Sequence, residues 1–391
     1  MAVKTNYTKG KSKYFRVSAV LGKDSNGKKI IKEFYGKSRR EAEEKKQNYL
    51  EGIEDGIKFD LVNSTIGILM KMWLYEVKRV SEKLKPSSFE KYEGIFRIYV
   101  ENGPLNNIGI QDIKSIQIQR YYNDLYSKGK SKSIIHNLNK LLKQFFFYAV
   151  DEGYISKNPC MGKRIVIPGQ KTVKEEIEHF TDDEIKILLD YLRNSSYREL
   201  ILICLGTGMR RGEALALTWD DVDLKENIIS INKSLGKVYL FDSEGNKTRK
   251  QIIQAPKTTS SIREIPFPMS LNSVFKDLKI KQKRNKLRCG ECYHESNYIF
   301  TTQSGTNIDV TNLSHAWDRI LKNAGLKHKK FHALRHTYAT KLFENHVELK
   351  TASKLLGHSS IEMTADIYTH VIPKQKIDAV EKINYIFENT L

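Results

Sequence analysis

Between Ser64 and about Lys163, apolar residues recur at the spacing that places them on one face of an α-helix. Pro86 and the Gly103-Pro104 pair divide this stretch, because proline does not continue a helix from within. Helices with such stripes bury them by packing against one another. The stretch therefore predicts a helical bundle whose aromatic residues form a core and do not stack on bases. The predicted core residues are Ile66, Leu69, Met70, Trp73, Leu74, Val77, Phe89, Tyr92, Ile95, Phe96, Tyr99, Ile134, Leu138, Leu141, Leu142, Phe145, Phe146 and Ala149.

The first 50 residues carry fourteen Lys and Arg against five Asp and Glu. Apolar and polar residues alternate over Phe15–Leu21, which is the period of a half-buried strand, and Lys29–Tyr35 predicts a second strand. Ser38 and Glu41 predict a capped helix that ends near Glu54. A small basic sheet with a helix is suited to a DNA groove, although a small domain with a solvated charged face has the same pattern.

The second half of the chain mixes helices with strands. Ile165–Glu178 has little periodicity and predicts a linker, after which Thr181 and Glu184 predict the capped start of a helix. Glu199–Leu217 predicts a mostly buried helix, and Ile228–Pro266 predicts strands broken by turns. Helical patterns resume beyond these strands.

These patterns predict a multidomain protein that is mainly α-helical with small β-sheets. A length of 391 residues fits two to three domains. We expect a basic β-sheet plus helix domain over residues 1–60, a helical domain over 64–165, and a mixed α/β domain over 175–391.

The formal net charge of the chain is +20, which favours a polyanionic partner through the release of counterions from phosphates. Charge alone leaves DNA, RNA and an anionic membrane open. No apolar run reaches the roughly 20 residues that span a bilayer, and residues 1–13 lack the apolar core of a signal peptide. Four scattered cysteines do not suggest a disulfide framework. We expect a reduced, cytoplasmic protein without a membrane partner.

Candidate catalytic residues gather near the C-terminus. His332 and Arg335 are three residues apart, so on a helix they would share a face and meet one phosphate together. Arginine suits this task because its planar fork grips two phosphate oxygens and stays protonated. His358 and Tyr368 follow, and far upstream Arg210 comes after a glycine-containing turn. Cations, imidazoles and a phenol together suit attack on a phosphodiester.

Taken in order, these segments resemble the boxes of the tyrosine recombinase (phage-type integrase) family. The resemblance places the first catalytic arginine of the family on Arg210, its acidic partner on Glu213 and the catalytic lysine on Lys257. Glu213 is expected to be a structural partner of the arginines or histidines. The whole chain fits the family plan of arm-binding, core-binding and catalytic domains, most closely that of phage and conjugative-transposon integrases. The matched segments are Thr207–Glu213, Pro256–Pro266, His332–His336, Leu356–His358 and Tyr368.

The resemblance also implies a role for each residue. Tyr368 would attack the scissile phosphate and form a 3′-phosphotyrosyl link, while Arg210 and Arg335 stabilise the transition state. Lys257 would protonate the leaving 5′-oxygen. His332 and His358 would hydrogen-bond the phosphate and help to move protons. One phosphoester is exchanged for another, so neither a cofactor nor a metal is expected, and the sequence contains no phosphate-binding GxxxxGK[ST] loop.

The implied function is integration and excision of a mobile element through a Holliday junction. The implied partners are double-stranded DNA at core and arm sites, a homotetramer on that DNA, and an excisionase or DNA-bending accessory protein. Two other functions remain open: a type IB topoisomerase, which shares this chemistry, and a DNA-binding protein with a decayed site.

Two further features have competing interpretations. Cys289 and Cys292 with His294 suggest half of a zinc site, but no second cysteine pair exists and the lysine-rich surroundings favour an ordinary loop. Beyond the tyrosine, Ile377, Val380, Ile383 and Phe387 recur at helical spacing. They predict a tail helix, which packs on its own domain or, as the resemblance implies, on a neighbouring protomer.

Overall fold

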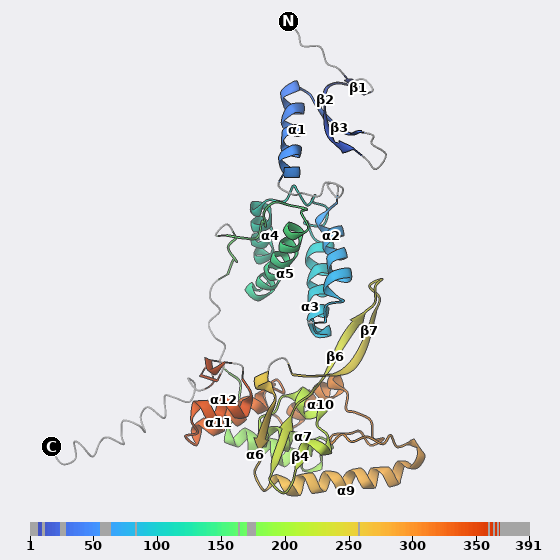
Figure 1. The fold of residues 1–391 in the computed structure, drawn as a ribbon. Helices are drawn as coiled ribbons and strands as arrows, with labels where there is room; N and C mark the ends of the chain where they lie inside the picture. Colours follow the sequence, from blue (N-terminus) through green and yellow to red (C-terminus); the bar gives the residue numbers. More distant parts are fainter. Residues whose placement is uncertain are drawn as a thin grey trace, which may run out of the picture. The chain divides into compact units, whose positions relative to one another are not determined.

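The computed structural model of the chain describes residues 7–9, 12–23, 29–54, 64–82, 84–162, 165–169, 177–256, 259–358, 360–362, 364–365 and 367. Internal contacts divide the chain into two units (Figure 1). The first comprises Met1–Thr172 with Phe241–Lys247, and the second comprises Val173–Leu240 with Thr248–Leu391. The chain is mainly helical with small β-sheets, which confirms the fold class predicted from the sequence.

The N-terminal part of the first unit is an antiparallel sheet followed by one helix. Ala19 and Phe34 from the sheet and Ala42 from the helix are buried, so the two layers share a small core. The Glu41 amide donates to Ser38 Oγ at 3.1 Å, which satisfies a backbone N–H at the helix start. The elements are β1 (Tyr7–Lys9), β2 (Ser12–Lys23), β3 (Lys29–Gly36) and α1 (Arg39–Glu54), with β2 in the centre of the sheet.

The rest of the first unit is the predicted helical bundle. Its core contains the aromatic side chains of Trp73, Phe96, Phe145 and Phe146, all at most 2% exposed. Val77 was expected in this core but is 40% exposed, because the helix widens into π-helical turns over Trp73–Lys78 and its later residues rotate away from the stripe. The helices are α2 (Ile66–Met72), α3 (Pro86–Phe96, with a π-helical extension Arg97–Glu101), α4 (Ser115–Ser127) and α5 (Lys132–Asp151).

The second unit contains helices and two small β-sheets, except that the tip of one sheet, Phe241–Lys247, belongs to the first unit. One sheet has the strand order β4-β5-β8, and the other is the hairpin β6–β7. Its strands are β4 (Val222–Asp223), β5 (Ile228–Ile231), β6 (Ser234–Phe241), β7 (Lys247–Gln254) and β8 (Arg263–Pro266). Its helices are α6 (Asp182–Tyr191), α7 (Arg198–Thr207), α8 (Arg211–Ala216), α9 (Leu271–Cys289), α10 (Val310–Asn323), α11 (Ala333–Glu344) and α12 (Leu349–Leu356). Short 3₁₀ turns cover Leu192–Asn194, Trp219–Asp221, Thr259–Ser261 and Gly290–Cys292.

Helix α7 lies at the centre of this unit and packs against both α9 and α11. The sequence predicted one helix over Glu199–Leu217, which is wrong: α7 ends at Thr207 and α8 begins at Arg211. Gly208 separates them because it adopts a left-handed backbone with φ of 63°. The capping box at Thr181 and Glu184 is confirmed, since each side chain accepts a hydrogen bond from the backbone of the other.

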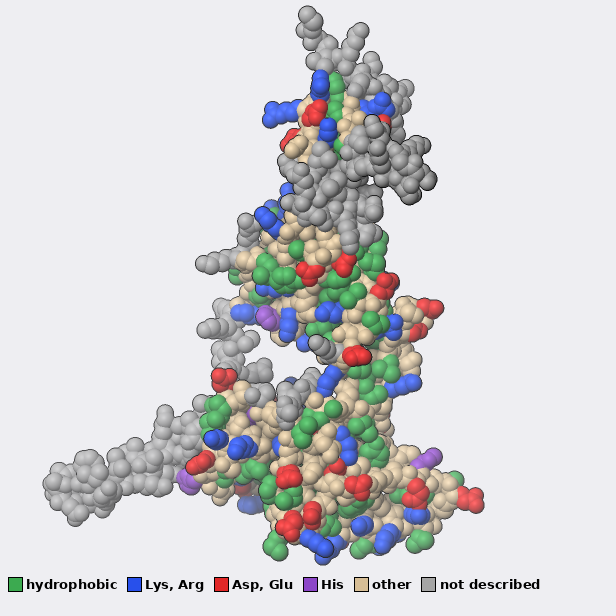
Figure 2. Space-filling model, viewed as in Figure 1, with side chains coloured by type: hydrophobic (Ala, Val, Ile, Leu, Met, Phe, Trp, Pro, Cys, Tyr) green, Lys and Arg blue, Asp and Glu red, His purple; other side chains and the backbone are tan. Residues whose placement is uncertain are grey.

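The outer surface of the second unit is mixed in charge on the face that Figure 2 shows, where basic and acidic side chains are interspersed. The excess positive charge therefore does not gather into one patch on that face. Within the described residues, no helix is both long and apolar enough to cross a membrane.

Trp317 on α10 offers a test of this core, because it is 1% exposed and packs edge-on against Phe180 and Phe331. Its indole N–H also donates to the Lys329 carbonyl at 2.8 Å. We expect Trp317→Ala to lower the free energy of unfolding by about 3–5 kcal/mol, since it leaves a cavity and an unpaired carbonyl. Chemical denaturation measures this. The control Leu287→Ala, at a side chain 86% exposed, should change it by less than about 0.5 kcal/mol; equal effects would contradict the assigned core.

Candidate active site

Arg210 occupies the turn between α7 and α8. It has an extended backbone and is the residue that caps the N-terminus of α8. Its backbone N–H donates to the Glu213 carboxylate at 2.9 Å, and its guanidinium donates to the same carboxylate at 2.7 Å. The turn needs Gly208, because a Cβ there would lie 2.3 Å from the ring of Tyr338. The local sequence thus fixes the backbone of Arg210 and supplies the first partner of its side chain.

Glu213 is the acidic centre of the site, with a side chain only 5% exposed. Besides Arg210, it accepts two hydrogen bonds from the guanidinium of Arg263 on β8, at 2.9 and 3.2 Å. Burial alone would raise the pKa of Glu213, but the hydrogen bonds and charges of Arg263 and Arg210 hold its pKa below the ordinary value. The carboxylate therefore stays ionised, which agrees with the structural role expected for it.

Arg335 comes from α11 and is 2% exposed. Its guanidinium donates to the Gly208 carbonyl at 2.9 Å and to the Leu356 carbonyl at 2.5 Å. Burial, and the positive charges of Arg210 and Arg263, lower the pKa of Arg335 to about 9. It stays protonated at neutral pH.

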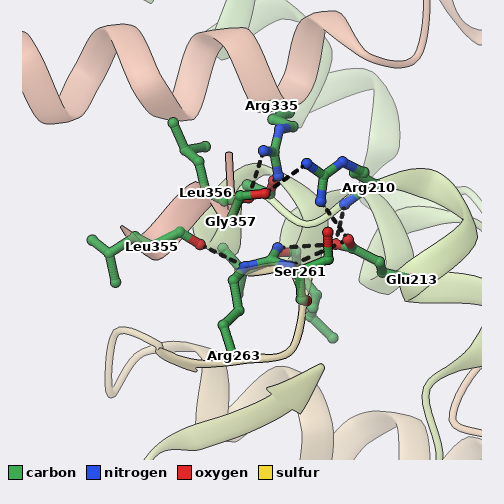
Figure 3. Close-up of polar contacts among 11 residues, drawn as sticks. Arg210, Glu213, Ser261, Arg263, Arg335, Leu355, Leu356 and Gly357 are labelled. Atoms are coloured by element: carbon green, nitrogen blue, oxygen red, sulfur yellow. Dashed lines mark hydrogen bonds and ion pairs between the residues drawn. The ribbon is translucent and has the colours of Figure 1, made fainter. Parts of the chain in front are cut away.

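The three arginines converge on the C-terminal end of α12 (Figure 3). Arg263 Nε donates to the Leu355 carbonyl at 2.8 Å, Arg335 donates to Leu356, and Arg210 donates to the Gly357 carbonyl at 2.9 Å. The last carbonyls of a helix lack intrahelical partners and carry the negative end of its dipole. Three consecutive carbonyls therefore orient three cations that come from three other elements.

Gly357 makes this approach feasible. It ends α12 in a left-handed conformation with φ of 64°, which glycine adopts without strain. A Cβ at this position would lie 2.7 Å from Arg263 Cδ. The glycine of the Leu-Gly-His segment thus serves the arginine cluster as well as the end of the helix.

Two histidines border the cluster. Burial, together with the nearby charges of Arg335 and Arg210, lowers the pKa of His358 to about 3, and its Nδ1 lies 2.7 Å from the Thr364 hydroxyl. Surrounding protein atoms exclude water from part of the His332 ring, and this desolvation, with His336 and the same arginines, lowers the pKa of His332 to about 4. The rest of the residue is exposed to solvent. Both imidazoles are therefore neutral at physiological pH and able to accept a proton.

The structure thus brings together four of the six site residues predicted from the sequence: Arg210, His332, Arg335 and His358. Lys257 and Tyr368 lie outside the described residues. Three guanidinium groups face a single carboxylate, so the cluster is cationic and suits a phosphodiester anion.

Sequence reasoning gave no site role to Arg263 or to His336, whose ring meets that of His332 edge-on with centroids 4.7 Å apart. A signal for Arg263 existed. Alternate residues of a strand lie on the same face, and Arg263 lies two positions before Ile265, which is fully buried in β8. The structural role expected for Glu213 also required a basic partner.

The Cys289, Cys292 and His294 segment gives no support for zinc. In the described part of the chain, no three His, Cys, Asp or Glu side chains are grouped as a metal site requires. Cys289 Sγ instead lies 3.3 Å from the Gln303 carbonyl, and Cys292 is exposed.

The fold and the site present a cationic cluster of arginines bordered by neutral imidazoles. Residues 178–375 match the phage integrase family, a range that includes Lys257 and Tyr368, and residues 65–126 match the N-terminal SAM-like domain of phage integrases. The chain belongs to the phage integrase family of tyrosine recombinases. Membership indicates a site-specific DNA recombinase.

Relatives extend over the whole chain. A protein named tyrosine recombinase XerC-like, from Caldanaerobacter subterraneus subsp. tengcongensis, is 50% identical over 99% of this chain and 100% of its own length. The integrase of Staphylococcus phage L54a is 25% identical over 83% of this chain and 94% of its own. The ICEBs1 integrase of Bacillus subtilis is 24% identical over 77% of this chain and 78% of its own.

Solved structures support the same fold. The Tn1549 transposon integrase in complex with transposon right end DNA aligns with a TM-score of 0.64 at 22% identity, over 81% of this chain and 99% of that one. A lambda integrase dimer bound to a core site aligns with a TM-score of 0.53 at 18% identity, over 78% of this chain and 95% of that one.

The lowered pKa of His358 predicts how stability depends on pH. An unfolded histidine titrates near pH 6.5, whereas the folded pKa is about 3. Below about pH 6.5 the unfolded chain binds a proton that the folded site rejects, so the free energy of unfolding should fall as the pH decreases from about 6.5 to 4. His358→Asn should remove about 1–2 kcal/mol of that fall, after allowance for partial exposure. Urea unfolding of the DNA-free protein at several pH values measures this, with the exposed His294→Asn as control. Identical pH dependence in all three proteins would contradict the assignment.

Proposed function

We propose that this recombinase integrates and excises a mobile genetic element through a 3′-phosphotyrosyl intermediate and a Holliday junction. The observation that carries the proposal is the convergence of Arg210, Arg335 and Arg263 on the end of α12. This cluster is prepared for an anion, and it lies in a chain whose family match includes a tyrosine ten residues beyond His358.

In the proposed reaction, Tyr368 Oη attacks the scissile phosphorus, the new P–O bond forms, and the bond to the 5′-oxygen breaks. Lys257 gives a proton to that oxygen, which leaves as a 5′-hydroxyl. The 5′-hydroxyl of a partner strand then reverses these steps and releases the tyrosine. Because each phosphoester replaces another, the exchange is close to isoenergetic and needs no external energy source.

The described residues would support this chemistry with the positive charge of the arginines and with two unprotonated imidazoles. Arg210 and Arg335 would bind the non-bridging oxygens, whose negative charge grows in the pentacoordinate transition state. Free tyrosine has a pKa of about 10, so the phenol needs a base. The lowered pKa values of His332 and His358 keep both imidazoles unprotonated. The negative charge of a bound phosphate would raise their proton affinity, so that one of them could accept the phenol proton.

We propose double-stranded DNA as the substrate, in line with the DNA complexes of the Tn1549 and lambda integrases. Residues 1–60 would bind arm-type sites, residues 64–165 core sites, and residues 175–391 would catalyse the exchange. Two strand exchanges on two duplexes require four active sites, so the working form would be a homotetramer, assisted by an excisionase or a DNA-bending protein. With DNA as its substrate, the protein would act in the cytoplasm.

Trapping a covalent adduct tests the proposal. On a nicked suicide substrate carrying the end of the element, the wild-type protein should form a protein–DNA adduct that resists denaturation. Tyr368→Phe should form none while its affinity for DNA stays within about threefold, because only the nucleophile is lost. Lys257→Ala should slow adduct formation by about 100-fold or more, and a substrate with a 5′-phosphorothiolate leaving group, which needs no proton, should restore the rate.

Two outcomes would contradict the proposed function. If the wild type and Tyr368→Phe equally lack an adduct, the chain is a DNA-binding protein without catalysis. If the wild type vigorously relaxes supercoiled DNA that carries no recognition site, the type IB topoisomerase alternative is correct.

The tail beyond the nucleophile provides a test of the tetramer. Deletion of the residues after Pro373 removes Ile377, Val380, Ile383 and Phe387. We expect the truncated protein to bind a single core site as the wild type does but to lose at least about tenfold in the yield of synaptic complexes on native gels. Unchanged synapsis would place the tail on its own domain.

A further inference from the structure

We propose that Arg263 is a positioning residue for strand cleavage, which sets the orientation of Arg210 through Glu213 and through the end of α12. This inference rests on the proposed function and deepens it, because it adds to the active site a residue that need not touch the DNA.

The contacts of Arg263 connect the parts of the site. Its guanidinium pairs with both carboxylate oxygens of Glu213, at 3.2 Å from Nη1 and 2.9 Å from Nη2. Its Nε donates to the Leu355 carbonyl at 2.8 Å, and Nη1 also donates to the Ser261 carbonyl at 3.2 Å. One side chain, only 6% exposed, thus ties β8 to the acid of α8 and to the C-terminus of α12.

Arg210 is held by the same carboxylate and by the same end of α12. Its guanidinium is held by Glu213 Oε1 on one side and by the Gly357 carbonyl on the other. Arg210 is 33% exposed, so it is open to a ligand, whereas Arg263 lies beneath it. Arg263 therefore holds one acceptor of Arg210, Glu213, directly, and it holds the end of α12 that carries the other acceptor through the Leu355 carbonyl. It also shares with Arg210 the neutralisation of Glu213.

The geometry requires a guanidinium. An arginine can donate in one plane to a carboxylate and, through Nε, to a carbonyl at the edge of the fork. The single ammonium of a lysine keeps the charge but cannot meet Glu213 and Leu355 at the same time. Arg263→Lys should therefore preserve the charge balance of the buried cluster while it releases the acceptors of Arg210.

The decisive measurement separates chemistry from binding and from folding. In single-turnover cleavage of the suicide substrate at saturating DNA, we expect Arg263→Lys to lower the rate constant by about 100-fold, the scale of loss for an ångström-sized misplacement of a catalytic group. Its dissociation constant for the uncleaved site should stay within about threefold of the wild type. A partly unfolded preparation would lower the amplitude of adduct formation and leave the rate constant unchanged. The matched control is Arg284→Lys, at an exposed arginine of α9, which should cleave at the wild-type rate.

A second variant approaches the same contact from the other side. Gly357→Ala adds a methyl group within 2.7 Å of Arg263 Cδ and strains a backbone whose φ is 64°. It should therefore displace Arg263 together with the Gly357 carbonyl and lower the cleavage rate constant at saturation. If Arg263→Lys is too unstable to purify, this variant carries the test. The inference is overturned if either variant, folded and saturated with DNA, cleaves within about threefold of the wild-type rate constant. If the wild type itself forms no adduct, the proposed function fails, and this inference fails with it.

Discussion

The active site depends on the way in which the C-terminal end of α12 satisfies its carbonyl groups. Leu355, Leu356 and Gly357 each accept a hydrogen bond from a different arginine, so one helix end orients three guanidinium groups. A helix terminus without partners would leave these acceptors unpaired in a buried place, which costs free energy. The hydrogen bonds that satisfy the end of α12 therefore also hold the cationic cluster together.

Assembly of like charges is unfavourable unless something offsets the repulsion between them. Glu213 offsets part of this repulsion, because its buried carboxylate pairs with both Arg210 and Arg263. One carboxylate among three guanidinium groups leaves the cluster cationic. The remaining positive charge favours a phosphate at this place, because a bound phosphate would offset the repulsion between the arginines. Preorganised donors of this kind need little rearrangement during the reaction.

Much of the fold followed from local patterns. Helical stripes predicted the bundle of the first unit, and the capping pair at Thr181 predicted the start of α6. Errors arose where the backbone left regular geometry. The π-helical turns that begin at Trp73 turned Val77 outward, and the left-handed Gly208 divided a continuous apolar stretch into α7 and α8. Apolar periodicity does not reveal either irregularity. The π-helical turns change the phase of a helix and Gly208 ends one, but neither changes which residues are apolar.

The sequence by itself determined the family, because membership rests on residue type and spacing. It also predicted the order of the domains and the side chains that suit phosphodiester chemistry. Only the tertiary structure decided how the arginines are held. Their partners are main-chain carbonyls of α12, which any residue can supply and which no sequence motif marks. The role of Arg263 likewise depends on the packing of β8 against α8 and α12, since its partners Glu213 and Leu355 lie 50 and 92 residues away along the chain.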